Sequence, residues 1–521
     1  MAPADLPAYD AVLLRQARRQ PDRPLFAVAG RPAVTAGEYA ALAGRTASVL
    51  AAAGVGRGDR IAVWAENSIA WLVLLAAAAW RGAALVTVHP AATEPELAAA
   101  LRRTRPVRLF AAREIRDRDV TSSARRAATG PVTFLPADQA GDALAGLPGW
   151  AGPPPEPARD PDAPLNVQFT SGSTGTPKMV VLTGRNLVRN ATWTAQAAGI
   201  GPADRICCPL PFAHAAGLSS GVVLAAVTGA QLFPVPRFRP DDVLDVVHRH
   251  QCTVVQLVPT MATMLADRLD EQPRRWDLAA LRLGFLGGAS CPPALRARVR
   301  DTLRLRRLAV VYGQTEAGPT ISVDPDDGSC PPDGSTVGRV LPGLRARIVA
   351  VDADGSPRPL PAGAEGELQV RGESVSPGYL DDPAANRAAY DPQGWLRTGD
   401  LARLAADGTL TLTGRVKDLI IRGGENVSPA EVEAFLLTCE GVAQACVVGV
   451  ASPRWGEEVV AVVVATPGAT LRRTELAAAA AGSLSRHKVP TDWYVVTELP
   501  LLPSGKVDRR AVTAMIDGVA Q

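Results

Sequence analysis

The sequence lacks the cysteine patterns and the long apolar segment that mark several large classes of protein. None of its 7 cysteines forms a CxxC pair or has zinc-ligand spacing, which argues against a zinc site or a disulfide framework. The longest apolar run, Ile69 to Trp80, is shorter than the roughly 20 residues that a membrane-spanning helix needs. The N-terminal stretch contains no apolar core of signal-peptide length. These absences predict a cytoplasmic protein with reduced cysteines and no membrane segment.

A strong charge of either sign is also missing. The chain has 55 basic and 52 acidic residues and a net charge of +3, which produces little field to attract a polyanion. Arginines cluster between Arg296 and Arg307, but no aromatic residue interleaves with them. A solvated helix face explains this cluster better than a nucleic-acid surface does. We therefore expect no nucleic-acid partner.

The sequence does contain a long alternation of strand and helix patterns. Its 521 residues exceed the roughly 250 to 300 residues at which a single core stops growing, so at least two domains are expected. Apolar runs at residues 60–64 and 84–88 flank the helical pattern at 69–80, as in βαβ units with parallel strands. The same rhythm returns at residues 253–258, 283–287 and 308–312. The predicted fold class is therefore α/β, with doubly wound sheets in a large N-terminal domain.

Two later regions have different patterns. After Val337, alternating residues and turn signals predict an antiparallel sheet or a small β-barrel. After Gly414 a new set of strand and helix patterns begins, and the remaining hundred or so residues suffice for an α+β domain. We place the boundary at residues 416–417, between an N-terminal domain of residues 1–415 and a C-terminal domain of residues 418–521.

The stretch TSGSTGTPKMV, residues 170–180, concentrates small hydrogen-bond donors after an apolar-leaning run. Gly172 and Gly175 would let the backbone approach a ligand, while hydroxyls and amides would offer donors to phosphate oxygens. Lys178 adds a positive charge. A Walker A loop needs its lysine directly after a glycine, whereas two residues separate Lys178 from Gly175. Alone, the stretch fits a phosphate-binding loop and a solvated loop equally well.

The motif VYGQTEAG, residues 311–318, follows an apolar strand pattern. Ligands bind at the carboxyl ends of strands in α/β folds, which is where this motif is expected to lie. Tyr312 is suited to stacking on a purine, Thr315 to bonding a phosphate, and Glu316 to holding Mg²⁺. A plain strand-to-loop turn with a solvated Glu316 explains the motif alone equally well.

Three further charged residues follow glycine turns. Asp400 in WLRTGDLA is suited to the two hydroxyls of a ribose, and Arg415 in GRVKDLI lies in the next motif. An exposed ion pair between Asp400 and Arg415 is an equally good explanation of these two residues. Lys506 in LPLLPSGKVDRR is, taken alone, an ordinary solvated lysine.

The order of these five motifs carries more information than any one of them. From about Pro7 to Arg510, the chain resembles the adenylate-forming superfamily of acyl-CoA synthetases, peptide-synthetase adenylation domains and luciferases, and is most similar to aryl- or fatty-acyl-CoA ligases. The resemblance implies activation of a carboxylic acid by ATP and Mg²⁺, release of pyrophosphate, and transfer of the acyl group to CoA. It also implies a hinge at residues 416–417, with Lys417 at its centre, about which the small C-terminal domain swings.

The resemblance assigns roles residue by residue. Lys506 matches the lysine that bridges the carboxylate and the α-phosphate, Thr315 the α-phosphate contact, and Glu316 the Mg²⁺ ligand. Gly423 and Gly424 match the segment that faces the thiol channel. The ATP-binding residues that it implies are Thr170, Ser171, Gly172, Ser173, Thr174, Gly175, Lys178, Gly288, Ala289, Ser290, Tyr312, Gly313, Thr315, Asp400 and Arg415.

The acyl pocket carries the information about the substrate. His214 and Ala215 stand where amino-acid-activating relatives have an aromatic residue and an aspartate. A buried ammonium without a carboxylate is costly, so α-amino acids are disfavoured. His214 instead resembles the gate histidine of acyl-CoA ligases, although a packed loop histidine remains an alternative. The expected lining is His214, Ala215, Ala216, Ser220, Gly287, Gly288 and Ala289, whose small members predict an aryl, arylacrylic or medium to long acyl acid.

Two residues depart from the family pattern. Met179 stands where the phosphate loop usually has glycine, and Gly184 replaces the usual histidine of the following motif. Either change is consistent with drift or with a specialised offshoot. A carrier protein in place of CoA, or an unusual oxyanion such as nitrite in place of the carboxylate, therefore remains an alternative, and the oligomeric state is expected to be monomer or homodimer.

Two alternatives from other classes of function remain at this point. The stretch GLSSG fits the nucleophile elbow of a serine hydrolase, with Ser219 as nucleophile and His487 as its partner. That elbow should follow a buried strand, and no acid for a triad is evident. A non-catalytic ATP-binding protein is the other alternative, and the presence of Lys506, Glu316 and Asp400 argues against it.

Overall fold

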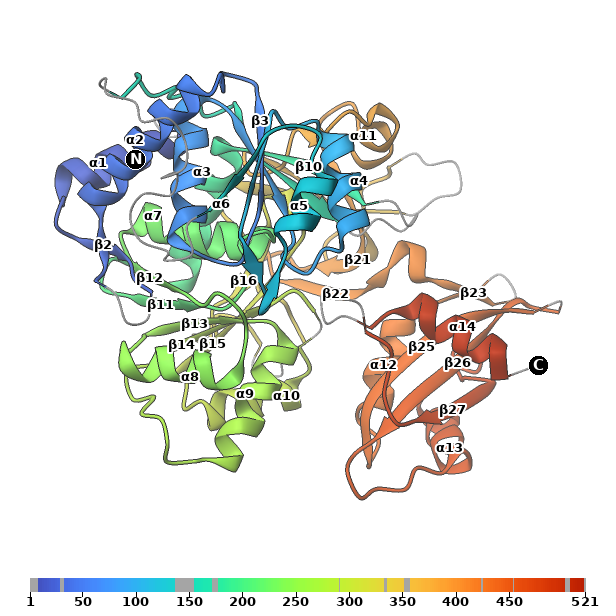
Figure 1. Cartoon of the computed structure of the whole chain (residues 1–521). Coiled ribbons are helices and arrows are strands. Elements are labelled where there is room, and N and C mark those ends of the chain that lie inside the picture. Colours follow the sequence, from blue (N-terminus) through green and yellow to red (C-terminus); the bar gives the residue numbers. More distant parts are fainter. Residues whose placement is uncertain are drawn as a thin grey trace. The chain divides into compact units, whose positions relative to one another are not determined.

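The computed structural model describes residues 8–28, 32–135, 154–170, 177–289, 291–331, 335–350, 357–422, 425–452, 454–501 and 507–519. The chain forms two compact units (Figure 1). Unit 1 comprises Met1–Ala346 and Val370–Leu396, and unit 2 comprises Arg347–Gln369 and Arg397–Gln521. The boundary predicted at residues 416–417 marks where the mobile C-terminal domain is expected to begin, and it stays a prediction.

A seven-stranded sheet in unit 1 contains the first predicted βαβ unit. β3 (Arg60–Trp64) pairs in parallel with β4 (Ala84–Val88) and with β5 (Arg108–Ala111). β4 also pairs in parallel with β9 (Pro164–Thr170), which pairs antiparallel with β10 (Lys178–Thr183). The order is β20-β10-β9-β4-β3-β5-β8, with β20 at Gly378–Tyr379 and β8 at Val132–Phe134.

The longest apolar run forms helix α3 (Ile69–Arg81) of unit 1. Ser68 caps its first turn by accepting a hydrogen bond from the Trp71 amide at 3.2 Å, and Gly82 ends it in the left-handed conformation at a φ of 64°. A helix that is apolar on all sides belongs in a core, and the side chains of α3 from Leu72 to Ala78 are fully buried. In the ranges that the structure describes, no helix combines the length and apolarity needed to cross a membrane.

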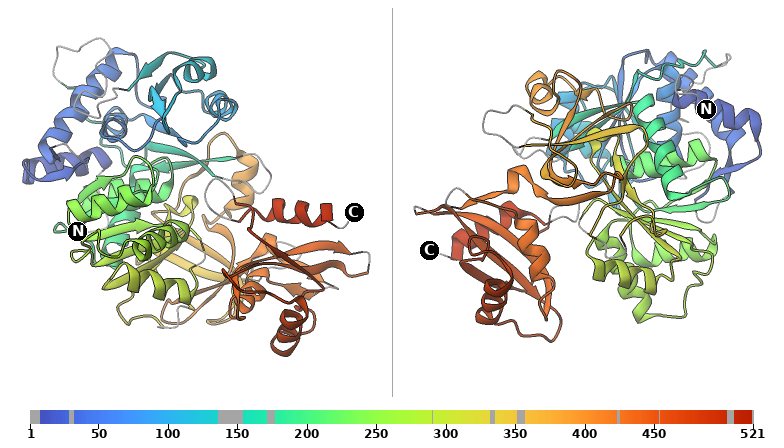
Figure 2. Two further views of the ribbon diagram at one scale, coloured as in Figure 1. Left: turned by 60° about the horizontal axis from the view of Figure 1, so that its bottom comes forward. Right: turned by 180° about the vertical axis from the view of Figure 1, so that it is seen from behind.

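A nine-stranded sheet in unit 1 contains the second set of predicted strands. β11 (Arg205–Cys208), β13 (Val254–Leu257), β14 (Leu283–Gly287) and β15 (Arg307–Gly313) run in parallel side by side. Helices α8 (Pro240–Arg249), α9 (Pro259–Glu271) and α10 (Pro293–Thr302) pack apolar side chains against one face of it (Figures 1 and 2). The sheet order is β17-β16-β15-β14-β13-β11-β12-β1-β2, with β1 at Pro24–Phe26, β2 at Val34–Thr35, β12 at Gln231–Pro234, β16 at Thr320–Asp324 and β17 at Arg339–Val340. The predicted doubly wound α/β fold is confirmed.

The other elements of unit 1 cover or connect these sheets. Helices α4 (Glu94–Thr104) and α5 (Thr121–Ala127) pack on the seven-stranded sheet. Also present are α1 (Tyr9–Arg19), α2 (Ala36–Ala52), β6 (Glu114–Ile115), β7 (Arg118–Asp119), α6 (Gly184–Ala198), a π-helix at Gly217–Val223, α7 (Leu224–Thr228), a 3-10 turn at Thr315–Ala317 and α11 (Pro383–Ala389).

The antiparallel region predicted after Val337 corresponds to a four-stranded sheet that contributes most of its residues to unit 2. Its order is β18 (Leu344–Val349), β19 (Glu365–Gly372), β21 (Leu396–Leu404) and β22 (Leu410–Arg415). A 3-10 turn at Val416–Asp418 follows β22 directly.

The last part of unit 2 is a sheet covered by helices on both faces. β25 (Val442–Ser452) and β26 (Gly456–Ala465) are its longest strands, joined by β23 (Ile420–Arg422), β24 (Glu425–Val427) and β27 (Asp492–Val496). Because side chains alternate along a strand, Val459, Ala461 and Val463 of β26 face α12 (Pro429–Leu436) and α13 (Arg473–Ser483). Their neighbours on β26 face α14 (Arg509–Val519).

Candidate active site

The predicted phosphate loop lies between β9 and β10. Thr170, the last residue of β9, pairs with Lys178, the first residue of β10, so the base of the loop is fixed by a strand pair. Five predicted site residues within the loop, Ser171, Gly172, Ser173, Thr174 and Gly175, lie outside the described residues. Lys178 is half-buried, and its Nζ lies 4.7 Å from the centre of the Tyr379 ring.

Side chains alternate across β10 at the end of this loop. Lys178 contacts Tyr379, whereas the next side chain, Met179, is buried in the apolar core beneath α4 and α5. The Met179 carbonyl accepts a hydrogen bond from the Leu380 amide at 2.8 Å. The departure at Met179 therefore adds a core side chain.

The motif around Tyr312 lies at the carboxyl end of β15. The strand ends at Gly313, where a Cβ atom would lie 1.9 Å from the Pro319 carbonyl oxygen, so only glycine fits. Thr315 and Glu316 follow in a 3-10 turn and are both buried. A Glu316 Oε1 atom accepts a hydrogen bond from the Tyr379 hydroxyl at 2.8 Å.

One buried polar side chain and one backbone amide hold this 3-10 turn and the residues that follow it. Asn190 on α6 accepts from the Thr320 amide at 3.1 Å and donates to the Thr320 carbonyl at 2.7 Å. The Ser376 amide donates to the Glu316 carbonyl at 2.8 Å. The backbone that carries Thr315 and Glu316 is thus anchored from two other segments.

The small residues of the predicted acyl pocket begin at the end of the neighbouring strand. Gly287, the last residue of β14, is paired with Val311, and a Cβ atom there would lie 2.7 Å from the Val311 carbonyl oxygen. Gly288 has a φ of +88°, which favours glycine, and Ala289 follows it. The close pairing brings this segment beside Tyr312. Ser290 lies outside the described residues.

His214 lies beyond the carboxyl end of β11, on the same sheet. It is exposed, and its Nδ1 accepts a hydrogen bond from the Ala216 amide at 3.3 Å. Ala215 and Ser220 are buried, and Ala216 is half-buried. Parallel strands end at one edge of a sheet, so β11, β14 and β15 bring His214, Gly287 and Tyr312 to the same edge.

Ser219 does not have the environment of a nucleophile. It lies in the π-helix and is fully buried, with its hydroxyl 3.4 Å from Asn190 Oδ1 and 3.3 Å from the Gly318 carbonyl oxygen. A nucleophile elbow exposes its serine on a sharp strand-to-helix turn. The geometry therefore argues against the serine hydrolase alternative.

In unit 2, Asp400 and Arg415 face each other on paired strands. Asp400 of β21 is in register with Arg415 of β22, and Asp400 Oδ1 lies 2.8 Å from Arg415 Nε. The carboxylate is buried, whereas the guanidinium is largely exposed. Burial, and secondarily the charge of Arg415, lowers the pKa of Lys417 in the following turn. Gly423, Gly424 and Lys506 lie outside the described residues.

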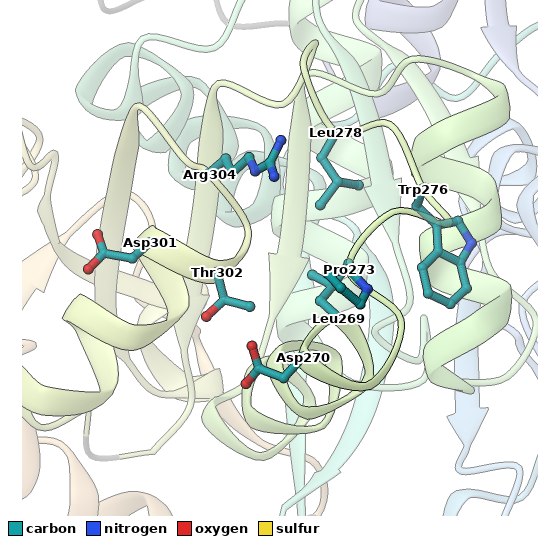
Figure 3. A pocket seen from close by; sticks show the side chains of 8 residues that line it. All are labelled: Leu269, Asp270, Pro273, Trp276, Leu278, Asp301, Thr302 and Arg304. Carbon is teal, nitrogen blue, oxygen red and sulfur yellow. The ribbon is translucent and has the colours of Figure 1, made fainter.

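A surface pocket of about 370 Å³ lies apart from these residues (Figure 3). Its lining comes from the end of α9, the loop that follows it, and the end of α10, and includes Leu269, Trp276, Asp301 and Arg304. Helices that follow parallel strands end at the amino edge of the sheet, opposite the edge where α/β folds bind ligands. None of the predicted site residues lines this pocket.

The sequence interpretation missed Tyr379 and Asn190. Both contact the Thr315–Glu316 turn or its flanks, one through a phenol and one through a side-chain amide. Tyr379 follows the SPG turn and belongs to no periodic pattern. Only the pairing of β20 with β10 brings it near Glu316 and Lys178.

Comparison with known proteins agrees with this geometry. The family model described as "AMP-binding enzyme" matches residues 13–380, and that described as "AMP-binding enzyme C-terminal domain" matches residues 431–506. The putative acyl-CoA synthetase YngI of Bacillus subtilis (strain 168) is 34% identical over 502 residues, which cover 91% of this chain and 90% of the relative. The sulfoacetate–CoA ligase of Cupriavidus necator is 34% identical over 504 residues, which cover 96% of both chains.

Among solved structures, ATP-bound MatB from Rhodopseudomonas palustris superposes with a TM-score of 0.86 at 28% identity. The match covers 99% of this chain and 100% of MatB. Both family models, the relatives and the fold agree with the motif order in the sequence. The chain therefore belongs to the AMP-binding enzyme family and is an adenylate-forming ligase of the acyl-CoA synthetase type.

Proposed function

We propose that the protein activates an aryl, arylacrylic or medium- to long-chain carboxylic acid with ATP and transfers the acyl group to CoA. The observation that carries this proposal is the gathering of His214, Gly287 and Tyr312 at the carboxyl edge of one parallel sheet. The small residues Ala215, Gly287, Gly288 and Ala289 suit a bulky acyl group. Because a sulfoacetate ligase is as similar in sequence as YngI, the relatives alone do not select the acid.

In the first half-reaction, a carboxylate oxygen of the substrate attacks the α-phosphorus of ATP, and pyrophosphate leaves. In this proposal Tyr312 stacks on the adenine, Thr315 contacts the α-phosphate, and Asp400 and Arg415 hold the ribose. The phosphate loop and Lys178 bind the β- and γ-phosphates. Lys506 stabilises the negative charge that builds between the carboxylate and the α-phosphate in the transition state.

In the second half-reaction, the sulfur of CoA attacks the acyl carbonyl carbon, the thiol proton is lost, and AMP leaves. We propose that Lys417 is the hinge for the movement between the two half-reactions. Gly423 and Gly424 then leave room for the pantetheine arm, and His214 gates the acyl pocket. The exposure of the His214 ring in unit 1 is consistent with a gate.

Mg²⁺ fits the donor set around Glu316. Across the described part of the chain, no three His, Cys, Asp or Glu side chains group together as metal ligands. Mg²⁺ needs no such cage, because it is commonly held by one or two carboxylates together with substrate phosphates and waters. Glu316 offers one buried carboxylate whose hydrogen-bond donor is a neutral phenol. When bound with ATP, Mg²⁺ neutralises charge on the phosphates.

A hydroxylamine-trapping screen tests this proposal. Aryl, arylacrylic, short-, medium- and long-chain acids are each incubated with the enzyme, ATP and Mg²⁺, with and without CoA. We expect hydroxamate from bulky apolar acids and none from acetate, with the acyl group diverted to the thioester when CoA is added. A response confined to small or α-amino acids would contradict the proposed substrate class.

The same screen addresses the alternative acceptors and substrates. If an acid forms hydroxamate but CoA has no effect, a carrier protein becomes the better acceptor. Nitrite, tested in parallel by ATP consumption, addresses the oxyanion alternative. We propose a cytoplasmic monomer or homodimer, which size-exclusion chromatography with light scattering distinguishes from larger assemblies.

A further inference from the structure

We propose that Tyr379 is a positioning residue that holds Glu316 and Lys178 apart and ready for metal-bound ATP. The inference rests on the proposed function, in which Glu316 holds Mg²⁺ and Lys178 contacts the β- and γ-phosphates. All three residues belong to unit 1. Two contacts meet on the Tyr379 side chain: its hydroxyl lies 2.8 Å from Glu316 Oε1, and its ring centre lies 4.7 Å from Lys178 Nζ.

The position of Tyr379 is fixed by its backbone. The Asn386 Oδ1 atom accepts a hydrogen bond from the Tyr379 amide at 2.6 Å, and Asn386 Nδ2 donates to the Tyr379 carbonyl at 3.1 Å. Gly378 precedes it at a φ of +133°, where a Cβ atom would lie 2.5 Å from Asn386 Oδ1. Tyr379 is only 7% exposed. Asn386 thus fixes the backbone of Tyr379, and burial leaves the phenol little room to move away from Glu316.

The chemistry of the phenol suits a carboxylate that must keep its charge. A tyrosine hydroxyl, whose ordinary pKa is about 10, is a neutral donor at neutral pH, and here it donates to Glu316 Oε1 at 2.8 Å. A neutral donor orients the carboxylate and leaves its negative charge for a cation. An arginine or lysine in the same place would neutralise that charge and compete with Mg²⁺.

The ring performs the complementary task for Lys178. An ammonium over the face of a tyrosine ring is attracted by the ring quadrupole without forming an ion pair. Among the described residues, no ion pair joins Lys178 to Glu316. The ammonium thus stays available to phosphate oxygens and the carboxylate to Mg²⁺, although both lie against one side chain.

The test measures nucleotide binding rather than turnover. Isothermal titration calorimetry records the affinity for ATP without any acid substrate, once with Mg²⁺ and once with EDTA. Tyr379→Phe removes the hydroxyl and keeps the ring, whereas Tyr379→Leu removes both. Tyr390→Phe is the matched control, because the Tyr390 hydroxyl lies in the same cluster but bonds to Ser376 Oγ at 2.9 Å.

Tyr379→Phe should reduce the gain in ATP affinity on adding Mg²⁺ by roughly ten-fold, the size expected for one hydrogen bond to a charged group, with little change in EDTA. Tyr379→Leu should also weaken ATP binding in EDTA, because Lys178 loses the aromatic ring that positions its ammonium. Tyr390→Phe should leave both affinities unchanged. Thermal melts of all three variants identify any that fail to fold. If Tyr379→Leu does not fold, the comparison of Tyr379→Phe with Tyr390→Phe still tests the inference, because Tyr379→Phe keeps the ring.

Two results would overturn the inference. One is an unchanged or larger Mg²⁺-dependent gain in Tyr379→Phe, and the other is an equal loss in Tyr379→Phe and Tyr390→Phe. A Glu316→Gln background sharpens the result, since the effect of Tyr379→Phe should disappear there. If the unaltered protein binds no ATP in either condition, the proposed function itself fails, which differs from a failure of the role of Tyr379 alone.

Discussion

Two buried carboxylates that have proposed roles toward ATP, one in each unit, differ in the group that contacts them. Glu316 in unit 1 is 9% exposed and accepts from the neutral hydroxyl of Tyr379. Asp400 in unit 2 is 4% exposed and lies 2.8 Å from the charged guanidinium of Arg415. Their burial is alike, but among the described residues a cationic side chain is in contact with Asp400 and none is paired with Glu316.

This difference matches two kinds of ligand. A carboxylate with an uncompensated charge is suited to a cation, whereas one already paired with arginine is better suited to accept hydrogen bonds from hydroxyl groups. Removing the charge of Glu316 should therefore affect chemistry, and removing that of Asp400 should affect binding. Of the described cations with proposed roles, Arg415 and Lys417 belong to unit 2 and are exposed, whereas Lys178 belongs to unit 1 and is half-buried.

Of the substitutions considered, replacement of Lys506 should have the largest effect on activity. Lys506→Ala should lower adenylate formation by 10² to 10³-fold or more, because one donor aimed at developing charge supplies roughly 3 to 4 kcal/mol. Pyrophosphate exchange measures this loss. Thioester formation from a supplied acyl-adenylate should remain largely intact, and equal loss of both half-reactions would contradict the assignment.

Lysine is scarce in this chain, which makes Lys506→Arg a useful comparison for Lys506→Ala. The basic side chains of this chain are almost all arginine, with lysine only at positions 178, 417, 488 and 506. Lys488 is explained by its ion pair with Glu431 at 2.6 Å, and the other three lie in the motifs of the proposed site. A compact, mobile ammonium differs from a planar guanidinium, so Lys506→Arg should not restore adenylation.

Glu316→Gln and Asp400→Asn test the comparison of the two carboxylates directly. Glu316→Gln should lower kcat for adenylation by roughly ten- to a hundred-fold and raise the Mg²⁺ concentration needed, since the metal loses a charged ligand. Asp400→Asn should raise the KM for ATP by roughly ten-fold with a smaller change in kcat, as expected when a binding contact is lost. Steady-state kinetics over a range of Mg²⁺ concentrations separates the two.

The comparison would break if the two variants behaved alike. A change confined to KM in Glu316→Gln, or a changed Mg²⁺ requirement in Asp400→Asn, would remove the distinction drawn from their partners. The exposed Asp407, which accepts from the Thr409 amide at 3.0 Å in a turn of unit 2, offers a control carboxylate outside the proposed site. Asp407→Asn should change neither parameter.

The fold was more accessible to sequence reasoning than the site was. Strands β3, β4 and β14 begin and end where the apolar runs predicted, because parallel strands buried on both faces leave uninterrupted apolar segments. Tyr312 and Asp400 could be proposed from the sequence because local order identifies their motifs, and their roles stay predictions. Tyr379 could not be proposed in this way, since its role depends on pairing between β10 and β20, which lie far apart in the sequence and have no shared local pattern.

Met179 shows the same limit within a single motif. From the sequence, its departure from the usual glycine was consistent with drift or with a specialised offshoot. In the structure the side chain packs in the core under α4 and α5, so its effect should be on stability. Met179→Ala should lower the free energy of unfolding by about 2 to 5 kcal/mol, with little change in the kinetics of the folded enzyme.

Urea denaturation followed by circular dichroism checks this prediction. Met264 on α9 is 48% exposed and provides the matched control, because Met264→Ala should change stability by less than about 0.5 kcal/mol. If Met179→Ala instead left stability unchanged and altered pyrophosphate exchange, the residue would act in the phosphate loop after all.

The smallest effect is expected at the second departure, Gly184, the first residue of α6. A Cβ atom there would lie 3.4 Å from the Pro161 carbonyl oxygen and 3.5 Å from the Tyr9 amide nitrogen, which are ordinary contacts. Gly184→Ala should therefore stabilise the protein by about 0.5 kcal/mol, by restricting the unfolded chain, and leave ATP binding unchanged. At Gly343 a Cβ atom would lie 1.8 Å from the Trp193 ring, so Gly343→Ala should destabilise instead. The urea midpoints of the two alanine variants should move in opposite directions. If Gly184→Ala destabilises the protein, the glycine is needed for the fold. If Gly184→Ala weakens ATP binding, the glycine is needed for the site.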